Sequence, residues 1–434
     1  MTTGQQRDKY TFMEEEWGID GNPFPSEAIE ATNGPYCDHL FPEEKSSFIS
    51  QLVYSAVMDR RPMGFLWSKG PEGRDTGFGK TTMMRNVASQ INEDWGKRIL
   101  EEAGMRPEKV REHKLIALYA AMNTLSVAGI YPLLFSAVEY AADPRYGVDN
   151  KCLLERCRER ILEEAGSDPS NPDANDFIEG AVLNARQTLG PTLPPMRSDF
   201  LDAFVAGEPI ADVLAEVSPA SRVRNGLAYF DVLFTIAYAT GIHDVFVSID
   251  QLEDLATRRD IGNAKKQREV GRFRDILSET PHYKGNLHAI FTFHVRAQQQ
   301  LGWMWRQERL PSFDPDDPAN QGSVVVLRGL RTTDQVKDLL VTYLDTRRVN
   351  RADVGIIRPF EPTALDALLQ RSEGRVGILL QDAYRILDTA ALQGYSRIDG
   401  GYIQDLFGGR TEPTVQRDTT TTESQTDIVD RLLQ

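Results

Sequence analysis

A glycine-rich stretch between a short apolar run and a helical pattern constrains the fold more than any other part of this sequence. Residues 63–67, MGFLW, form an apolar run typical of a buried parallel strand. The stretch SKGPEGRDTGFGKTT follows at residues 68–82. Apolar residues then recur at helical spacing, at Met83, Met84, Val87, Ala88 and Ile91. A strand, a glycine loop and a helix in this order form the setting that a phosphate-binding loop requires.

The loop ends in Gly79-Lys80-Thr81, the last part of a Walker A motif. In that motif backbone N–H groups surround phosphate oxygens, the lysine ammonium reaches the β and γ phosphates, and the hydroxyl binds Mg²⁺. Five residues, one more than in the consensus, separate Gly73 from Gly79, and Arg74 stands where a glycine is expected. The candidate nucleotide-binding residues are Gly77, Phe78, Gly79, Lys80, Thr81 and Thr82.

Four further apolar runs predict the other strands of a parallel sheet. They lie at Leu115–Ala120, Val245–Ile249, Ala289–Phe293 and Val324–Leu327. About 120 residues separate the second predicted strand from the third, which is long for one crossover connection. We therefore expect an α/β core with an inserted helical subdomain at about residues 125–226.

The segment DVFVSIDQLEDL, residues 244–255, has the pattern of a Walker B motif, an apolar strand that ends in an acid. Asp250 is the candidate Mg²⁺-ordering carboxylate, and Thr81 is the second candidate metal ligand. Gln251 follows where a glutamate is usual, so the general base is Glu253 or Asp254, or is missing. The structural alternative is that Asp250 caps the next helix by accepting backbone N–H bonds.

Together these segments resemble the AAA+ ATPases, and among them the replication-initiator, secretion-ATPase and transposition-regulator clade. The resemblance covers roughly residues 17–407 and includes NPF at 22–24, GFGKTT and FVSIDQLEDL. HAIFTFHVRA, residues 288–297, is similar to the sensor 1 strand, where Thr292 or His294 would contact the γ-phosphate or the attacking water. Residues 358–391 are similar to the clade's helical lid, with Arg375 at the sensor 2 position.

The resemblance implies ATP and Mg²⁺ as cofactors and a site that a neighbouring subunit completes with an arginine, since fixed positive charge stabilises the transferred phosphoryl group. Arg296, Arg306 and Arg309 are the candidates, with Arg309 in the closest sequence context; the alternative is a surface arginine in a salt bridge. The implied partner is the chain itself, as a ring or helical assembly. A protein partner would bind the insert or the C-terminal tail.

A basic stretch follows the Walker B segment, RRDIGNAKKQREVGRFR at residues 258–274. Lys265, Lys266 and Arg268 are candidate contacts to a DNA backbone; the alternative is a solvated helix or a subunit contact. We expect the nearby Trp303 and Trp305 to be core or interface aromatics rather than base-stacking platforms.

Charge and composition limit the remaining function classes. With 49 basic and 64 acidic residues the net charge is −15, which argues against a nucleic-acid binder that uses its whole surface. No apolar run is long enough to span a membrane, and the first residues lack the order of a signal peptide. The three cysteines have no metal-ligand spacing and cannot all pair, which fits a reducing compartment. Together these features lead us to expect a cytoplasmic protein without membrane partners.

The predicted organisation is a lead-in at residues 1–42, whose first 16 residues fray, then a P-loop α/β core at 43–330. A helical lid at 331–407 and a flexible tail at 408–434 with a terminal amphipathic helix complete it. The expected activity is that of an ATPase whose ATP state switches self-assembly, in a DNA transaction such as loading or target selection, or in phage defence. The alternatives are a STAND-type signalling NTPase with protein partners and a non-hydrolysing, ATP-bound scaffold.

Overall fold

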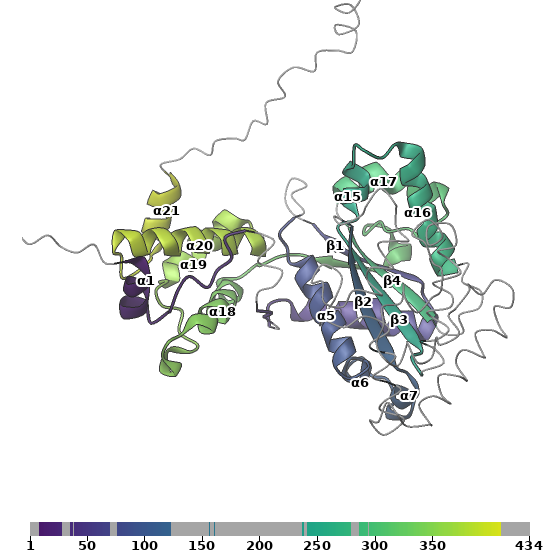
Figure 1. The fold of residues 1–434 in the computed structure, drawn as a ribbon, viewed down its shortest axis with the longest axis horizontal. Coiled ribbons are helices and arrows are strands. Elements are labelled where there is room, and N and C mark those ends of the chain that lie inside the picture. The colour runs from purple at the N-terminus through teal and green to yellow at the C-terminus, as the bar shows by residue number, and fades with distance from the viewer. Residues whose placement is uncertain are drawn as a thin grey trace, which may run out of the picture. The chain divides into compact units, whose positions relative to one another are not determined.

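The computed structural model divides the chain into two compact units (Figure 1). The core unit comprises Asp38–Gly329 with Arg375–Gly377, and the helical unit comprises the rest. The structure describes residues 8–27, 35–37, 39–69, 76–122, 241–278, 286–293 and 295–408, with the single residues 156, 160 and 237. The predicted insert, apart from two of these single residues, and the predicted tail beyond residue 408 lie outside the described residues.

The core unit is built on a five-stranded sheet in the order β2-β3-β4-β1-β5, with every neighbouring pair parallel. The α/β class, the parallel sheet and all the predicted strands are confirmed. The strands are β1 Met63–Ser68, β2 Leu115–Ala121, β3 Asp244–Asp250, β4 Asn286–Phe293 and β5 Val324–Leu327. Nearly every strand residue is buried because helices cover both faces of the sheet, which is why the strands read as continuous apolar runs (Figure 1).

The helix predicted at residues 43–59 is continuous but changes its winding. It begins as α3 Pro42–Ser47, continues as the π-helical η2 Phe48–Tyr54 and ends as α4 Ser55–Asp59. The other helices of the core unit are α5 Lys80–Glu93, α6 Lys97–Glu102, α7 Pro107–Glu112, α15 Glu253–Thr257, α16 Asn263–Ser278, α17 Val295–Gln307 and the 3-10 turn η6 Pro318–Asn320.

An aromatic cluster fixes α17 against the sheet. Phe65 of β1 and Phe293 of β4 both contact Trp305 of α17 and Phe313, with ring centroids 4.3 to 6.0 Å apart. The Trp305 indole N–H, otherwise buried, donates to the Pro311 carbonyl at 2.7 Å. Trp305 is therefore a core aromatic, as the sequence predicts.

In the helical unit, the N-terminal segment packs on C-terminal helices. The elements of this unit are α1 Lys9–Phe12, η1 Met13–Trp17, α18 Thr333–Leu344, η7 Asp345–Arg347, η8 Arg351–Asp353, α19 Pro362–Ser372, α20 Val376–Gln393 and α21 Gly400–Gly408. The first two residues of α20 belong to the core unit. Met13 and Trp17 are buried, and the Lys9 ammonium lies 2.7 Å from the Asp388 carboxylate. The expectation that residues 1–16 fray is wrong for residues 9–16, because these contacts, distant in sequence, hold them.

A buried carboxylate stands at the amino end of β3, the opposite end from Asp250. Asp244 is fully buried; His288 Nε2 lies 2.9 Å from one carboxylate oxygen and His113 Nδ1 3.4 Å from the other. The other ring nitrogen of His288, Nδ1, donates to the Arg61 carbonyl at 2.6 Å. Burial alone would raise the pKa of Asp244, but the hydrogen bonds from His113 and His288 outweigh it, and the pKa is lowered from 3.8.

Asp244→Asn is expected to destabilise the core unit by about 3 kcal/mol, because one partner of a buried pair is removed. Since the folded-state pKa lies below 3.8, the carboxylate's contribution is present above about pH 4 and is lost as the pH falls through the lowered pKa. Urea unfolding at neutral pH and at about pH 3 measures both effects. Asp316→Asn is the matched control, since that carboxylate is 77% exposed and should change stability by less than about 0.5 kcal/mol.

Candidate functional site

The glycine loop leads from the carboxyl end of β1 into α5. Ser68 is the last residue of β1, and α5 begins at Lys80. Gly77 and Gly79 have φ of 83° and 88°, in the left-handed region where a side chain would be strained. Gly79 is the N-cap of α5 and offers no side-chain cap, so the first N–H groups of this helix have no side-chain acceptor from the cap position. Residues 70–75, which carry the irregular spacing with Gly73 and Arg74, lie outside the described part.

Lys80 and Thr81 are each held by the end of a strand. The Lys80 ammonium donates to the Ser68 hydroxyl at 2.6 Å, and Ser68 is fully buried. The Thr81 hydroxyl donates to Asp250 Oδ2 at 2.6 Å. The two segments predicted as Walker motifs, in which Thr81 and Asp250 are 169 positions apart, therefore meet through one side-chain hydrogen bond.

Asp250 gathers four donors on one carboxylate. Besides Thr81, the Tyr119 hydroxyl of β2 donates to Oδ2 at 2.8 Å. The Thr292 hydroxyl of β4 donates to Oδ1 at 2.6 Å, and the Gln251 N–H donates to the same oxygen at 2.9 Å. The strand order explains the convergence, because β3 lies between β2 and β4 and parallel strands bring their carboxyl ends to one edge. We refer to Lys80, Thr81, Tyr119, Asp250 and Thr292 as the loop-edge site.

The helix-cap alternative for Asp250 is wrong. The helix that follows β3, α15, begins at Glu253 with Leu252 as its N-cap, and no side chain caps it. The Asp250 carboxylate accepts from the backbone only at Gln251, next to it in sequence. Asp250 is 2% exposed and faces the loop and the neighbouring strands instead.

Gln251 is strained where the Walker B pattern usually has a glutamate. Its φ of 58° is left-handed, which is unfavourable for a residue with a long side chain. Two acceptors hold its N–H in place, Asp250 Oδ1 at 2.9 Å and Thr292 Oγ1 at 3.0 Å. Its side-chain Oε1 is buried, and no donor among the described residues reaches it. A strained backbone fixed by its neighbours at this position is characteristic of a functional site.

The sequence argument missed Ser68, Tyr119 and Arg85. Burial, followed by the charge of Asp250, raises the pKa of Tyr119 far above its ordinary value, so the phenol keeps its proton and donates. The Arg85 guanidinium of α5 lies 4.9 Å from the centre of the Tyr119 ring. The available signal was a single hydroxyl-bearing aromatic near the end of the otherwise aliphatic run LIALYAA.

The other predicted site residues are distributed as follows. Arg375–Gly377 belongs to the core unit, and the Gly377 N–H donates to the Gly77 carbonyl at 2.8 Å, so Arg375 lies beside the glycine loop. A Cβ built on Gly77 would lie 3.8 Å from that of Arg375. Phe78 is buried, and Thr82 lies in the first turn of α5.

Of the remaining catalytic candidates, the structure describes the side chains of Arg306 and Arg309. Arg306 and Arg309 are exposed at the end of α17; Arg306 lies about 17 Å along the helix from its first residue, at 1.5 Å per residue. His294 and the side chains of Glu253 and Arg296 lie outside the described part of the structure. The assignments of His294, Glu253 and Arg296 therefore stay predictions.

Ion pairs neutralise much of the basic stretch 258–274. Arg258 pairs with Asp260, Arg272 with Glu269, and Arg274 with Asp275 and Glu308. Lys266 is 8% exposed and cannot share an open cationic face with Lys265 and Arg268, as the DNA-contact hypothesis requires. Arg268 is exposed on α16 and Lys265 is half-buried.

The ligand set at the loop-edge site is suited to Mg²⁺ held together with a phosphate. Mg²⁺ prefers oxygen ligands and is commonly bound through one or two carboxylates plus substrate phosphates, and Asp250 and Thr81 offer such oxygens. Among the described residues no group of three or more His, Cys, Asp and Glu side chains forms a metal site of its own. An ion at Asp250 would therefore need oxygens from a ligand or water.

Comparisons with known proteins identify no family for this chain. No family model matches the chain, and no curated protein matches it. In the described part of the structure, no helix has both the length and the apolar character needed to cross a membrane.

Proposed function

We propose that the core unit binds Mg²⁺-ATP at the loop-edge site and hydrolyses it. The observation that carries this proposal is the 2.6 Å hydrogen bond from Thr81 to Asp250, which brings the two motifs together. The left-handed glycines and the uncapped start of α5 support it, because an anion is favoured where backbone N–H groups and the helix dipole meet.

Each residue has a role that follows from its surroundings. The Lys80 ammonium exchanges the Ser68 hydroxyl for phosphate oxygens, which are stronger acceptors because they are charged. Thr81 and Asp250 provide oxygen ligands for Mg²⁺, which neutralises charge on the phosphates when bound. Thr292, hydrogen-bonded to both Asp250 and Gln251, links the γ-phosphate side of the site to β3.

Hydrolysis requires a base that Gln251 cannot be. An amide neither accepts a proton at neutral pH nor carries charge, although its buried Oε1 can accept a hydrogen bond from a water. Glu253, the first residue of α15, is the nearest carboxylate in sequence beyond Asp250 and is the proposed base, with Asp254 as the alternative. Gln251 itself favours a second candidate function, that of an ATP-bound scaffold without turnover.

We further propose that ATP controls self-assembly, with an exposed arginine of α17, Arg306 or Arg309, acting on a neighbouring copy. Both arginines are exposed and therefore accessible to a neighbouring copy. The biological use remains a proposal between a DNA transaction and a STAND-type signalling or defence role with protein partners.

Glu253→Gln is expected to bind Mg²⁺-ATP with unchanged affinity and to lower turnover at least about 100-fold, since general-base catalysis contributes about 10² to 10⁴. Because this variant cannot hydrolyse the bound ATP, it should stay in the assembled, higher-mass form after ATP is added. The wild-type chain should return to the smaller form once its ATP is hydrolysed. Steady-state phosphate release and mass photometry with and without ATP measure both outcomes.

Asp254→Asn provides the matched comparison, one position further along α15. Loss of turnover in that variant alone would transfer the base assignment to Asp254. A wild-type chain that binds Mg²⁺-ATP but releases no phosphate would support the scaffold and contradict the hydrolysis part of the proposal.

A further inference from the structure

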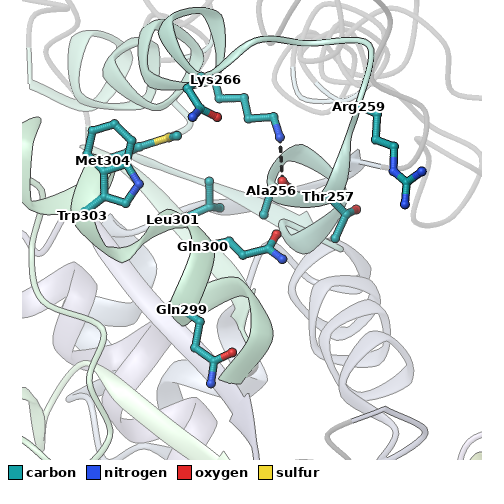
Figure 2. Close-up of a pocket in the computed structure, with 10 residues that line it drawn as sticks. Ala256, Thr257, Arg259, Lys266, Gln299, Gln300, Leu301, Trp303 and Met304 are labelled. Atoms are coloured by element: carbon teal, nitrogen blue, oxygen red, sulfur yellow. Dashed lines mark hydrogen bonds between the residues drawn. The ribbon is translucent and has the colours of Figure 1, made fainter. Parts of the chain in front are cut away.

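A cavity lies in the core unit among α15, α16 and α17, and none of the loop-edge residues lines it. Its volume is about 450 Å³, within the range of small-molecule sites. Figure 2 shows Lys266 extending from α16 to the Ala256 carbonyl, with Trp303 and Met304 toward one end and Thr257 and Arg259 toward the other. We call this the three-helix cavity.

Lys266 brings an ammonium to the cavity that pairs with no carboxylate among the described residues. Its Nζ donates to the Ala256 carbonyl at 2.7 Å (Figure 2). The neighbouring arginines of the same helix differ in this respect, since Arg272 pairs with Glu269 and Arg274 with Glu308. A buried ammonium whose one acceptor is a neutral carbonyl is costly unless an anion accompanies it. The cavity is the open side from which such an anion can arrive.

Arg259 adds a second cation, at the rim. It is exposed, and no acceptor in the described part of the chain pairs with it. The described lining contains no Asp or Glu, although acidic residues outnumber basic ones by 64 to 49 in the whole chain. Local charge of this sign in an acidic protein favours a negatively charged ligand.

Trp303 provides a planar apolar surface toward the opposite end of the cavity from Arg259. It is 45% exposed, whereas Trp305, two positions on in the same helix, is 1% exposed. The expectation that both are core or interface aromatics therefore fails as a core assignment for Trp303. Gln300 and Thr257 add uncharged hydrogen-bonding groups. These groups are better suited to bind the edge of a base than to bind a second phosphate.

We propose that the three-helix cavity binds a nucleotide unit, with its phosphate on Lys266 and Arg259 and its base stacked on Trp303. A nucleotide combines an anionic phosphate, a flat base and polar groups at the edge of that base, and the cavity offers a partner for each of the three. The unit is either a free nucleoside monophosphate or one nucleotide of a single strand. The site is separate from the Mg²⁺-ATP site and does not depend on it.

The test uses the full chain carrying Lys80→Ala, so that the glycine loop does not contribute. Anisotropy of fluorescein-labelled oligothymidylate reports a strand ligand, and competition by thymidine 5′-monophosphate reports a free nucleotide. Trp303→Ala and Arg259→Ala are each expected to weaken binding at least about 5-fold, while Trp303→Phe, which keeps a stacking ring, retains most of it. Arg268→Ala, an exposed cation of α16 outside the cavity lining, is the control and should change affinity less than about 2-fold.

The outcomes separate the sources and can overturn the proposal. Tight oligonucleotide binding with weak competition identifies a strand, and competition at equal concentration identifies the free nucleotide. Binding of neither probe overturns the proposal, as does an equal loss in Arg268→Ala and Arg259→Ala, which would indicate general surface charge. Because the background lacks Lys80, failure here leaves the Mg²⁺-ATP proposal untouched.

Discussion

Lys80→Ala is expected to abolish ATP binding by the full chain, raising the dissociation constant at least about 100-fold. The Lys80 ammonium is the cation at the start of α5, and its bond to the buried Ser68 hydroxyl holds it at the end of β1. Without it, the triphosphate would lose the ammonium that the loop supplies, and charge-assisted hydrogen bonds are about twice as strong as neutral ones. Titration of a fluorescent ATP analogue in Mg²⁺ gives the dissociation constant directly.

Lys69→Ala is the matched control for Lys80. Lys69 lies one residue after β1, is exposed, and forms a surface ion pair with Asp316 at 3.3 Å. Removing it should change ATP affinity less than about 2-fold, because exposed pairs are weak and screened. Unchanged affinity in Lys80→Ala, with an intact unfolding transition, would refute the nucleotide site.

Asp250→Asn is expected to remove the Mg²⁺ dependence of ATP binding and to lower turnover at least about 100-fold, equivalent to about 2.7 kcal/mol of transition-state free energy. The amide keeps the size of the side chain but replaces one acceptor oxygen with an NH₂ group. That group would face a hydroxyl donor, and no charge would remain to hold the metal ion. Binding curves with Mg²⁺ and with EDTA, together with phosphate release, measure both effects.

Tyr119→Phe separates the metal role of Asp250 from its structural role. This change removes one of the four donors and leaves both carboxylate oxygens in place. We expect the Mg²⁺ dependence to survive in Tyr119→Phe and the unfolding free energy to fall by about 1 kcal/mol. A chain in which Asp250→Asn still shows full Mg²⁺ dependence would show that the metal is held elsewhere.

The sequence was informative wherever the decisive signal is local. Five apolar runs predicted the five strands, because strands covered on both faces have few solvent-facing positions and are mostly apolar. The glycines, Lys80 and Thr81 follow from the motif, and Asp250 follows from its place at a strand end. Nothing local links Tyr119 to Asp250, which lie 131 positions apart and meet only because β2 pairs with β3.

Two further features could not be predicted from the sequence, the burial of Lys266 and the packing of residues 9–16. Both lie in polar segments, and a polar sequence alone does not show which elements will cover it. Lys266 lies in a stretch rich in cations, yet α15 and α17 pack over it and bury it. The segment with Glu14, Glu15 and Glu16 looked like a fraying end, yet Met13 and Trp17 pack into the helical unit. In both cases the periodicity within one segment does not show which other elements pack against it.

The four donors on Asp250 also determine how the loop-edge site can be filled. Because Thr81, Tyr119, Thr292 and the Gln251 N–H already satisfy this carboxylate, the ligand-free protein carries no exposed, unbalanced charge at this position. A lone hydrated Mg²⁺ would have to break hydrogen bonds to a buried carboxylate and lose its own waters, with little in return. In the proposed function, a metal ion that arrives with a triphosphate brings new partners for Lys80 and α5 in the same event. We therefore expect Mg²⁺ and ATP to occupy the site together, by exchanging one bonding pattern for another.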